Sequence, residues 1–221
     1  MKSRIASLSP GTEFAVVTLG AFGLSILGSV MSVAFYFGRP VVSTTELYQT
    51  ILYEIVTLSV LAWFLQQRGW TLSKLSERPA LSDLPIGIGL GVAGLLIYYA
   101  VWALTVFSLP ATMKSAASMT MVSGRLGLGV VAAISVVNPI FEEAFLCGYI
   151  LTAMKAARSP TAAVNVSVAI RMLCHLYQGP VGLWIIPLGL MLAWFYARTR
   201  RLWPVVIAHM LLDLVGLVPY L

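Results

Sequence analysis

Seven long apolar runs limit what this chain can fold into more than any other feature of its sequence. They cover residues 14–37, 47–65, 84–109, 126–154, 161–177, 181–197 and 203–221, and each is 17 to 29 residues long. A helix needs about 20 apolar residues to cross the roughly 30 Å hydrocarbon core of a bilayer. The runs are continuously apolar and lack the alternation of polar and apolar residues that a membrane β-barrel strand shows. The sequence therefore predicts an all-α polytopic membrane protein with about seven transmembrane helices.

The composition excludes several other classes of protein. Apolar residues make up 59% of the chain and charged residues 10%, against about 45–50% and 25% in an average soluble domain. A soluble globular domain and a disordered chain are therefore excluded. We interpret the net charge of +6 as a signal of membrane topology, with the lipid bilayer as a partner and no nucleic acid. We expect one membrane domain, with helices and loops over residues 1–124 and a motif-bearing core over residues 125–221.

The basic residues between the runs predict how the protein is oriented. If the N-terminus is cytoplasmic, 10 of the 14 lysines and arginines fall in cytoplasmic segments and 3 fall in external ones. Cytoplasmic loops of membrane proteins carry an excess of lysine and arginine. We therefore expect a multi-pass protein of the cytoplasmic membrane, with its N-terminus inside and its C-terminus outside. The remaining basic residue, Arg171, lies inside an apolar run.

A glycine pattern in the third run resembles a nucleotide-binding motif only as a string of letters. Gly89, Gly91 and Gly94 match the spacing of the dinucleotide fingerprint. That fingerprint must follow a strand and open a helix, and this one lies inside an apolar run. We expect Gly87, Gly91 and Gly94 to allow two membrane helices to pack closely instead.

Seven ionisable residues lie inside the apolar runs, where each costs about 2.5–3.5 kcal/mol on insertion scales and is a functional candidate. They are Glu54, Glu142, Glu143, Arg171, His175, His209 and Asp213. Six of the seven, including both histidines of the chain, fall in three of the last four runs. This concentration predicts an active site between the last four helices. No motif surrounds Glu54, for which we expect an interhelical hydrogen bond.

The positions of these residues along their helices favour a common site. A rise of about 1.5 Å per residue places Glu142, His175 and His209 about 20, 22 and 12 Å from the cytoplasmic ends of their runs, in the middle of the membrane. Glu142 and Glu143 are adjacent and point about 100° apart on a helix. We therefore expect that they do not share a partner, and that one lines a cavity while the other makes a supporting contact.

Three motifs in the last four runs resemble those of the CAAX protease and bacteriocin-processing family, the glutamate-dependent intramembrane endopeptidases. The family's first motif is two glutamates, three residues and an arginine, and residues 142–147 read EEAFLC. The second is phenylalanine and three residues before histidine, and residues 171–175 read RMLCH. The third is histidine, three residues and then aspartate or asparagine, and residues 209–213 read HMLLD. Two positions depart from the family: Cys147 replaces the arginine and Arg171 replaces the phenylalanine.

The resemblance implies an enzyme, a CAAX-protease-like glutamic intramembrane peptidase. It assigns Glu142 and His175 to the water that attacks the peptide bond, and His209 and Asp213 to the oxyanion side. An ionised carboxylate only accepts hydrogen bonds, so Asp213 either acts in its protonated form or orients His209, and we favour orientation. Glu143 is expected to support the site. The implied substrate is a membrane-embedded or membrane-anchored peptide.

The two departures predict a relocated ion pair. Without an arginine at position 147, Glu143 loses the partner four residues away on its own helix. An arginine at position 171 places a cation in the next helix at about the same depth. We therefore predict that Arg171 pairs with Glu143 and that Cys147 is a supporting residue. The alternatives are that Arg171 extends its guanidinium to the membrane surface, or pairs with Asp213 or Glu142.

Alternative functions and cofactors follow from the same residues. Two histidines and two or three carboxylates could bind zinc with an open position, but no HExxH helix is present. We therefore expect no cofactor and keep zinc as the alternative. The alternative functions are a non-proteolytic immunity or scaffold protein of the same fold and a small proton-coupled transporter. The two halves of the chain show no internal repeat, which disfavours a transporter.

Overall fold

The computed structural model describes residues 7–35, 41–108, 121–155 and 159–221. The longer helices are α2 (Pro10–Ala34), α3 (Thr44–Gln67), α5 (Asp83–Ser108), α7 (Leu128–Glu143), α9 (Pro160–Cys174), α10 (Ile185–Thr199) and α11 (Leu202–Leu217). The short elements are β1 (Val41–Val42), α4 (Leu72–Leu75), β2 (Met121–Val122), η1 (Ala144–Ile150), α8 (Leu151–Lys155), η2 (Leu176–Trp184) and η3 (Val218–Tyr220). The prediction of an all-α polytopic membrane fold is confirmed.

Six helical segments in the described part of the chain are long and apolar enough to cross a membrane. They include α2, α3 and α5, the continuous segment α7–η1–α8, and two segments built on α10 and α11. The helix predicted over residues 161–177 is shorter than expected, because α9 ends at Cys174 after 15 residues. At about 1.5 Å per residue it is about 22 Å long, less than the hydrocarbon core of a bilayer. The count of about seven crossings therefore stays a prediction.

Local sequence signals explain where several helices begin. Ser9 and Ser159 cap α2 and α9, and each is followed by a proline in the first turn. A serine hydroxyl at this position accepts a hydrogen bond from a free backbone N–H, and proline has no N–H to satisfy. Ser43 caps α3 in the same way, with its hydroxyl accepting from the N–H of Glu46 at 3.2 Å.

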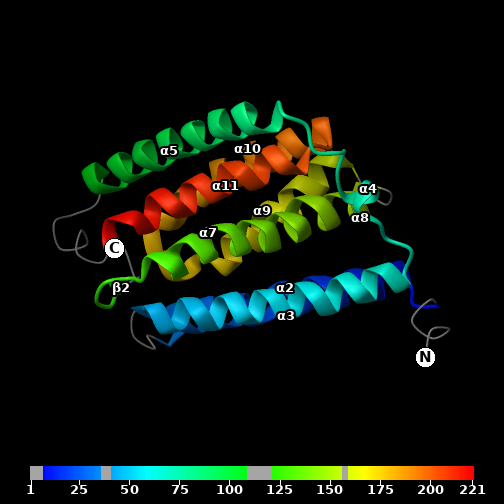
Figure 1. Ribbon diagram of the computed structural model, residues 1–221, viewed down its shortest axis with the longest axis horizontal. Coiled ribbons are helices and arrows are strands. Elements are labelled where there is room, and N and C mark those ends of the chain that lie inside the picture. The colour runs from blue at the N-terminus through cyan, green and yellow to red at the C-terminus, as the bar shows by residue number, and fades with distance from the viewer. Residues whose placement is uncertain (1–6, 36–40, 109–120, 156–158) are drawn as a thin grey trace.

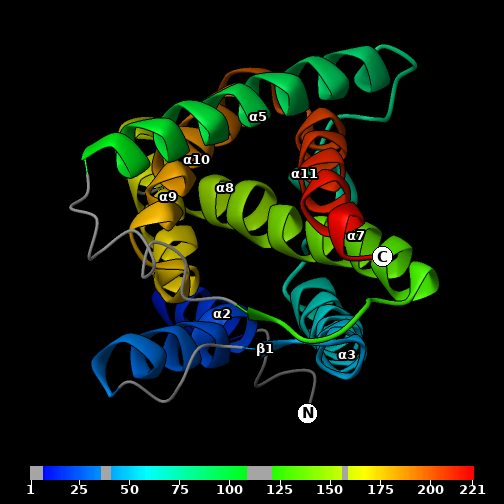
Figure 2. The ribbon, with the colours of Figure 1, turned by 90° about the vertical axis from the view of Figure 1, so that its left-hand side faces the viewer.

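The helices form a bundle with one central segment. Figures 1 and 2 show α7 and α8 between the α2–α3 pair on one side and α5 on the other, with α9, α10 and α11 completing the bundle. Strands β1 and β2 form a two-stranded parallel pair just before α3 and α7. The backbone N–H of Gly127 also donates to the Thr44 hydroxyl at 3.2 Å. Helices α3 and α7 therefore begin side by side and run in the same direction.

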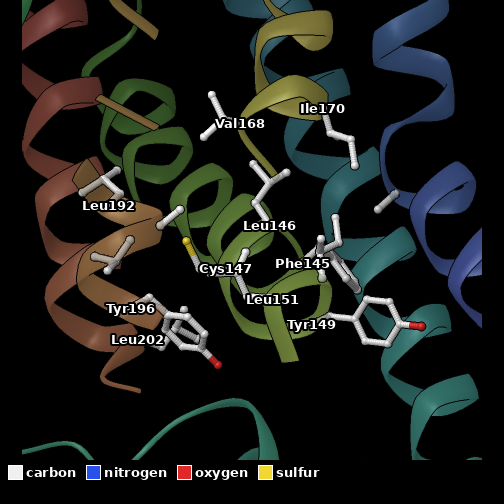
Figure 3. Packing of buried hydrophobic residues seen from close by; sticks show 14 of the residues in the cluster. Phe145, Leu146, Cys147, Tyr149, Leu151, Val168, Ile170, Leu192, Tyr196 and Leu202 are labelled. Atoms are coloured by element: carbon white, nitrogen blue, oxygen red, sulfur yellow. The ribbon is translucent and has the colours of Figure 1, made fainter. Parts of the chain in front are cut away.

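The central segment is also the most buried part of the chain. After Glu143 the helix changes to the π-helix η1, whose Phe145, Leu146, Cys147 and Tyr149 are all at most 3% exposed. Figure 3 shows these side chains pointing into the space between the surrounding helices. Single π-helical turns occur mostly within α-helices and often at functional sites. Pro139 lies inside α7, and the change of helix type begins five residues after it, at Ala144.

The expected close packing at the glycines of the third run is confirmed. A Cβ atom at Gly87 would lie 2.6 Å from the Ile207 side chain on α11, and one at Gly91 would lie 2.7 Å from Leu211. At Gly94 the nearest side chain would be 3.0 Å away. Real Cβ atoms essentially never come closer than 3.0 Å to a neighbour, so Gly87 and Gly91 allow α5 to pack against α11 at this distance.

The described basic residues are concentrated at one end of the bundle. At one end Arg68 pairs with Glu13 at 2.6 Å and Arg201 pairs with Asp83 at 2.5 Å. Seven described basic residues lie at this end: Arg68, Lys74, Arg78, Lys155, Arg198, Arg200 and Arg201. At the other end Arg125 donates to the carbonyl of Leu221 at 2.8 Å.

Candidate active site

The predicted site residues come from three helices that meet beside the central segment. Glu142 and Glu143 end α7, immediately before the π-helix. Arg171 lies in the last turn of α9, and both His209 and Asp213 lie on α11. The interactions described below join all five of these residues. The structure therefore brings these predicted site residues together.

Glu143 is the centre of this cluster. Its side chain is fully buried, with 0% exposed, and accepts from Arg171 Nη2 at 2.7 and 2.8 Å. The Nδ1 atom of His209 lies 2.7 Å from Glu143 Oε1, and the Cys147 thiol donates to Oε2 at 3.2 Å. The predicted pair between Arg171 and Glu143 is therefore confirmed. A buried carboxylate needs such partners, because burying an unpaired charge is costly.

Arg171 also contacts the second glutamate. Its Nη1 atom lies 3.3 Å from Glu142 Oε2, while Nη2 contacts Glu143. The expectation that the two glutamates do not share a partner is therefore wrong. The reason is the planar guanidinium fork, which presents separate N–H groups to two acceptors at once. The Arg171 side chain is 3% exposed and also interacts with the Cys147 thiol.

The two glutamates nevertheless differ in how many hydrogen bonds their carboxylates accept and in how exposed their side chains are. Glu143 accepts several short hydrogen bonds and has no exposed side-chain surface. Glu142 has one long contact to Arg171, and its side chain is 13% exposed. Only Glu142 therefore keeps acceptor capacity and room for another molecule.

His209 lies between two carboxylates. Its Nδ1 atom is 2.7 Å from Glu143 and its Nε2 atom is 3.4 Å from Asp213 Oδ1. Only the protonated imidazole ring has a donor on both nitrogens. The shorter contact is with Glu143, so this glutamate holds the ring more tightly than Asp213 does.

Asp213 has a partner that the sequence analysis missed. The side-chain amide of Asn138 on α7 donates to Asp213 Oδ2 at 2.9 Å. The available signal was an amide inside an apolar helix, one turn before Glu142 and therefore on the same helix face.

His175 lies at the end of α9 and not within it. Its Nδ1 atom is 2.8 Å from the carbonyl oxygen of Arg171, and its ring stacks on Tyr177 with centroids 6.0 Å apart. A carbonyl oxygen only accepts, so Nδ1 carries a proton and donates it to this bond, which points the Nε2 atom away from the contact. In the described part of the chain no hydrogen bond or ion pair joins His175 to Glu142 directly.

The same cluster contains a possible set of metal ligands. One ligand atom each from Glu142, Glu143 and His209 lie within 4.8 Å of one another. However, the Arg171 guanidinium already contacts both glutamates, and the Nδ1 atom of His209 is engaged by Glu143. A positive group therefore already balances these carboxylates, and the donor set suits a metal ion poorly.

Comparison with known protein families shows what part of the chain is similar to. Residues 124–215 match the family model described as type II CAAX prenyl endopeptidase Rce1-like. This segment is Rce1-like. The match confirms the resemblance inferred from the three motifs, all of which lie inside the Rce1-like segment. A search of curated proteins and a search of solved structures found no match. The Rce1-like segment supports a hydrolase of the CAAX endopeptidase type in a multi-pass membrane protein.

Proposed function

We propose that the protein is an intramembrane endopeptidase that hydrolyses a peptide bond of a membrane-embedded or membrane-anchored peptide. The observation that carries this proposal is the difference between the two adjacent glutamates. The Glu143 carboxylate is engaged by Arg171 and His209, whereas Glu142 is partly exposed and has one long contact, to Arg171. A general base must have room for the water that it activates, and Glu142 has it.

The proposed reaction uses Glu142 and His175 to hold the water. Glu142 takes one proton from the water, while the Nε2 atom of His175 accepts a hydrogen bond from the O–H that remains. The water oxygen forms a bond to the carbonyl carbon of the substrate. Glu142 then passes the proton to the departing nitrogen as the C–N bond breaks.

The oxyanion side of the reaction is assigned to His209. Its Nε2–H faces Asp213 across 3.4 Å, a loose contact that a developing oxyanion can replace. Glu143 and Asp213 keep the ring protonated and oriented, and Asn138 holds Asp213 in turn. Because Arg171 already neutralises the glutamates, we propose that no metal ion takes part.

Comparative peptidomics of membranes tests the proposed function. Membranes that contain the wild type are expected to hold product peptides that are missing when Glu142→Gln replaces it, because an amide cannot serve as the general base. Glu77→Gln, at an exposed position, is the matched control and should leave these peptides unchanged. Peptides with a prenylated C-terminal cysteine motif are compared first, because the family description names a prenyl endopeptidase. Identical peptide sets in wild type and Glu142→Gln would refute the proposal.

The orientation of the protein is a further prediction. We propose that the end of the bundle with seven described basic residues faces the cytoplasm. A reporter inserted within residues 68–78 should then be cytoplasmic, and one fused after Leu221 should be external. The measurement is the activity of a reporter that works on only one side of the membrane. If both positions report from the cytoplasm, the chain crosses the membrane an even number of times between them.

A further inference from the structure

Glu54 is a buried carboxyl group that the proposed mechanism does not use. It lies on α3, outside the Rce1-like segment, and is 4% exposed. Its Oε2 atom has no hydrogen-bond partner within the described ranges. The expected interhelical hydrogen bond is therefore not formed by this atom. Native proteins leave few buried polar groups unsatisfied, so each one needs an explanation.

The pairing of α3 with α7 places Glu54 at the level of the active site. The two helices begin side by side, where Thr44 contacts Gly127. Glu54 lies ten residues beyond Thr44, and Asn138 lies ten residues beyond Leu128, the first residue of α7. Both are therefore about 15 Å along their helices.

Packing and charge indicate which way Glu54 faces. Leu47 and Ile51, seven and three residues before Glu54, share its helix face and pack against the start of α7. Glu54 lies close enough to Glu142, Asp213 and His209 for their charges to act on its carboxyl group. Together with the packing of the same helix face on α7, this places Glu54 beside the site.

A second unsatisfied polar atom lies on α7 near the same level. The Ser135 hydroxyl is buried and has no hydrogen-bond partner among the described residues. Ser135, Asn138 and Glu142 lie three and four residues apart, so they follow one face of α7. Two helices thus direct unpaired polar groups toward the region where a substrate would lie.

The chemistry of a peptide in a bilayer explains what these groups could bind. A peptide bond that is to be cleaved must leave its helix, which exposes N–H and C=O groups that the lipid cannot satisfy. Among the described residues Glu54 forms no ion pair, and a buried carboxyl group without one is most stable with its proton. A protonated carboxyl group has one O–H donor. A main-chain carbonyl oxygen is the matching acceptor.

We propose that Glu54 is a substrate-positioning residue whose carboxyl group donates a hydrogen bond to a main-chain carbonyl of the peptide being cleaved. This role rests on the proposed function. It extends the active site to a helix of the N-terminal part of the chain, which the Rce1-like segment does not include. The unpaired Oε2 atom is then the group that the substrate satisfies.

Leucine and glutamine at position 54 separate this role from a structural one. Glu54→Leu removes the donor but fills the same space with an apolar group. It is expected to lower the cleavage of Glu142-dependent peptides on the order of tenfold, the effect of one lost hydrogen bond. The midpoint of thermal unfolding in detergent should stay the same or rise, because an unpaired buried polar group has been removed. Glu54→Gln keeps an N–H donor and should recover most of the cleavage.

Cleavage is measured on the product peptides that disappear in Glu142→Gln membranes. The control variant is Glu46→Leu, at an exposed position of α3, which should leave cleavage unchanged. Wild-type cleavage by Glu54→Leu would overturn the positioning role alone. A lower unfolding midpoint that accompanies the loss of cleavage would also overturn it, in favour of a structural role. If Glu142→Gln changes no peptide, the proposed function fails and the substrate role of Glu54 fails with it.

Discussion

Arg171→Phe is expected to lower the free energy of unfolding by about 3–5 kcal/mol, the usual cost of removing one partner of a buried ion pair. The change would leave Glu143, which has no exposed surface, without the guanidinium that contacts both of its oxygens. It would also remove the Arg171 contact to Glu142. The measurement is unfolding in detergent by heat or denaturant.

Adding Cys147→Arg to the same chain is expected to restore most of this stability. Cys147 is one helical turn after Glu143 and already contacts it at 3.2 Å, so an arginine there can reach the same carboxylate. The Cys147 and Arg171 side chains also interact, so the new arginine enters the space that the old one leaves. The double variant should therefore be more stable and more active than Arg171→Phe alone. If it is worse than either single variant, the two positions are not alternatives for one ion pair.

Arg198→Met is the matched control for this experiment. Arg198 is an exposed arginine in the last turn of α10, and its guanidinium lies over the Trp194 ring. Its replacement should change the unfolding free energy by less than about 1 kcal/mol, since exposed charge interactions contribute little. An equal loss of stability at both arginines would mean that the effect is not specific to the Glu143 pair.

His175→Ala and His209→Ala are both expected to lower cleavage by about 10² to 10⁴-fold, the usual contribution of a positioned acid–base group. They should differ in stability. His175 is partly exposed, and its Nδ1 atom contacts the carbonyl oxygen of Arg171 on α9. His209 is buried and faces both Glu143 and Asp213. Only His209→Ala removes one partner from each of two carboxylates, so it should also cost about 1–3 kcal/mol of stability.

Product peptides and unfolding midpoints measured on the same preparations test this contrast. Tyr177→Phe is a useful comparison, because it keeps the ring that stacks on His175 and removes only the hydroxyl. Full cleavage by His175→Ala would remove this histidine from the proposed mechanism. Equal stability of the two alanine variants would contradict the central position that the structure assigns to His209.

Most of the fold followed from the sequence because a bilayer permits few solutions. Continuous apolar runs must form helices, since the lipid offers no partner for free backbone groups. Close packing at Gly87 and Gly91 was also predictable, because small residues let helix backbones approach. The length of the helix before His175 was not predictable. Hydrophobicity continues past Cys174, whereas the helix ends there and η2 follows.

Part of the site was predictable from the sequence, because charge must be balanced in an apolar medium. The loss of an arginine at position 147 and its gain at position 171 predicted one relocated pair, and the structure contains it. Which other groups join that pair depends on distances between helices. Asn138 holds Asp213 only because α7 and α11 pack together. The unequal occupation of Glu142 and Glu143 likewise depends on the position of Arg171 across the bundle.

The sequence by itself determined the class of protein, most of the helical segments, the three motifs and the ion pair that balances Glu143. These properties depend on composition, on the spacing of residues along the helices and on the need to balance charge in an apolar medium. Tertiary structure alone decided that Arg171 bridges both glutamates, that His209 lies between two carboxylates, and that the Glu54 carboxyl group is buried with an unpaired oxygen. Contacts between helices far apart in the chain depend on how the helices rotate and pack, and no spacing within a single helix specifies that.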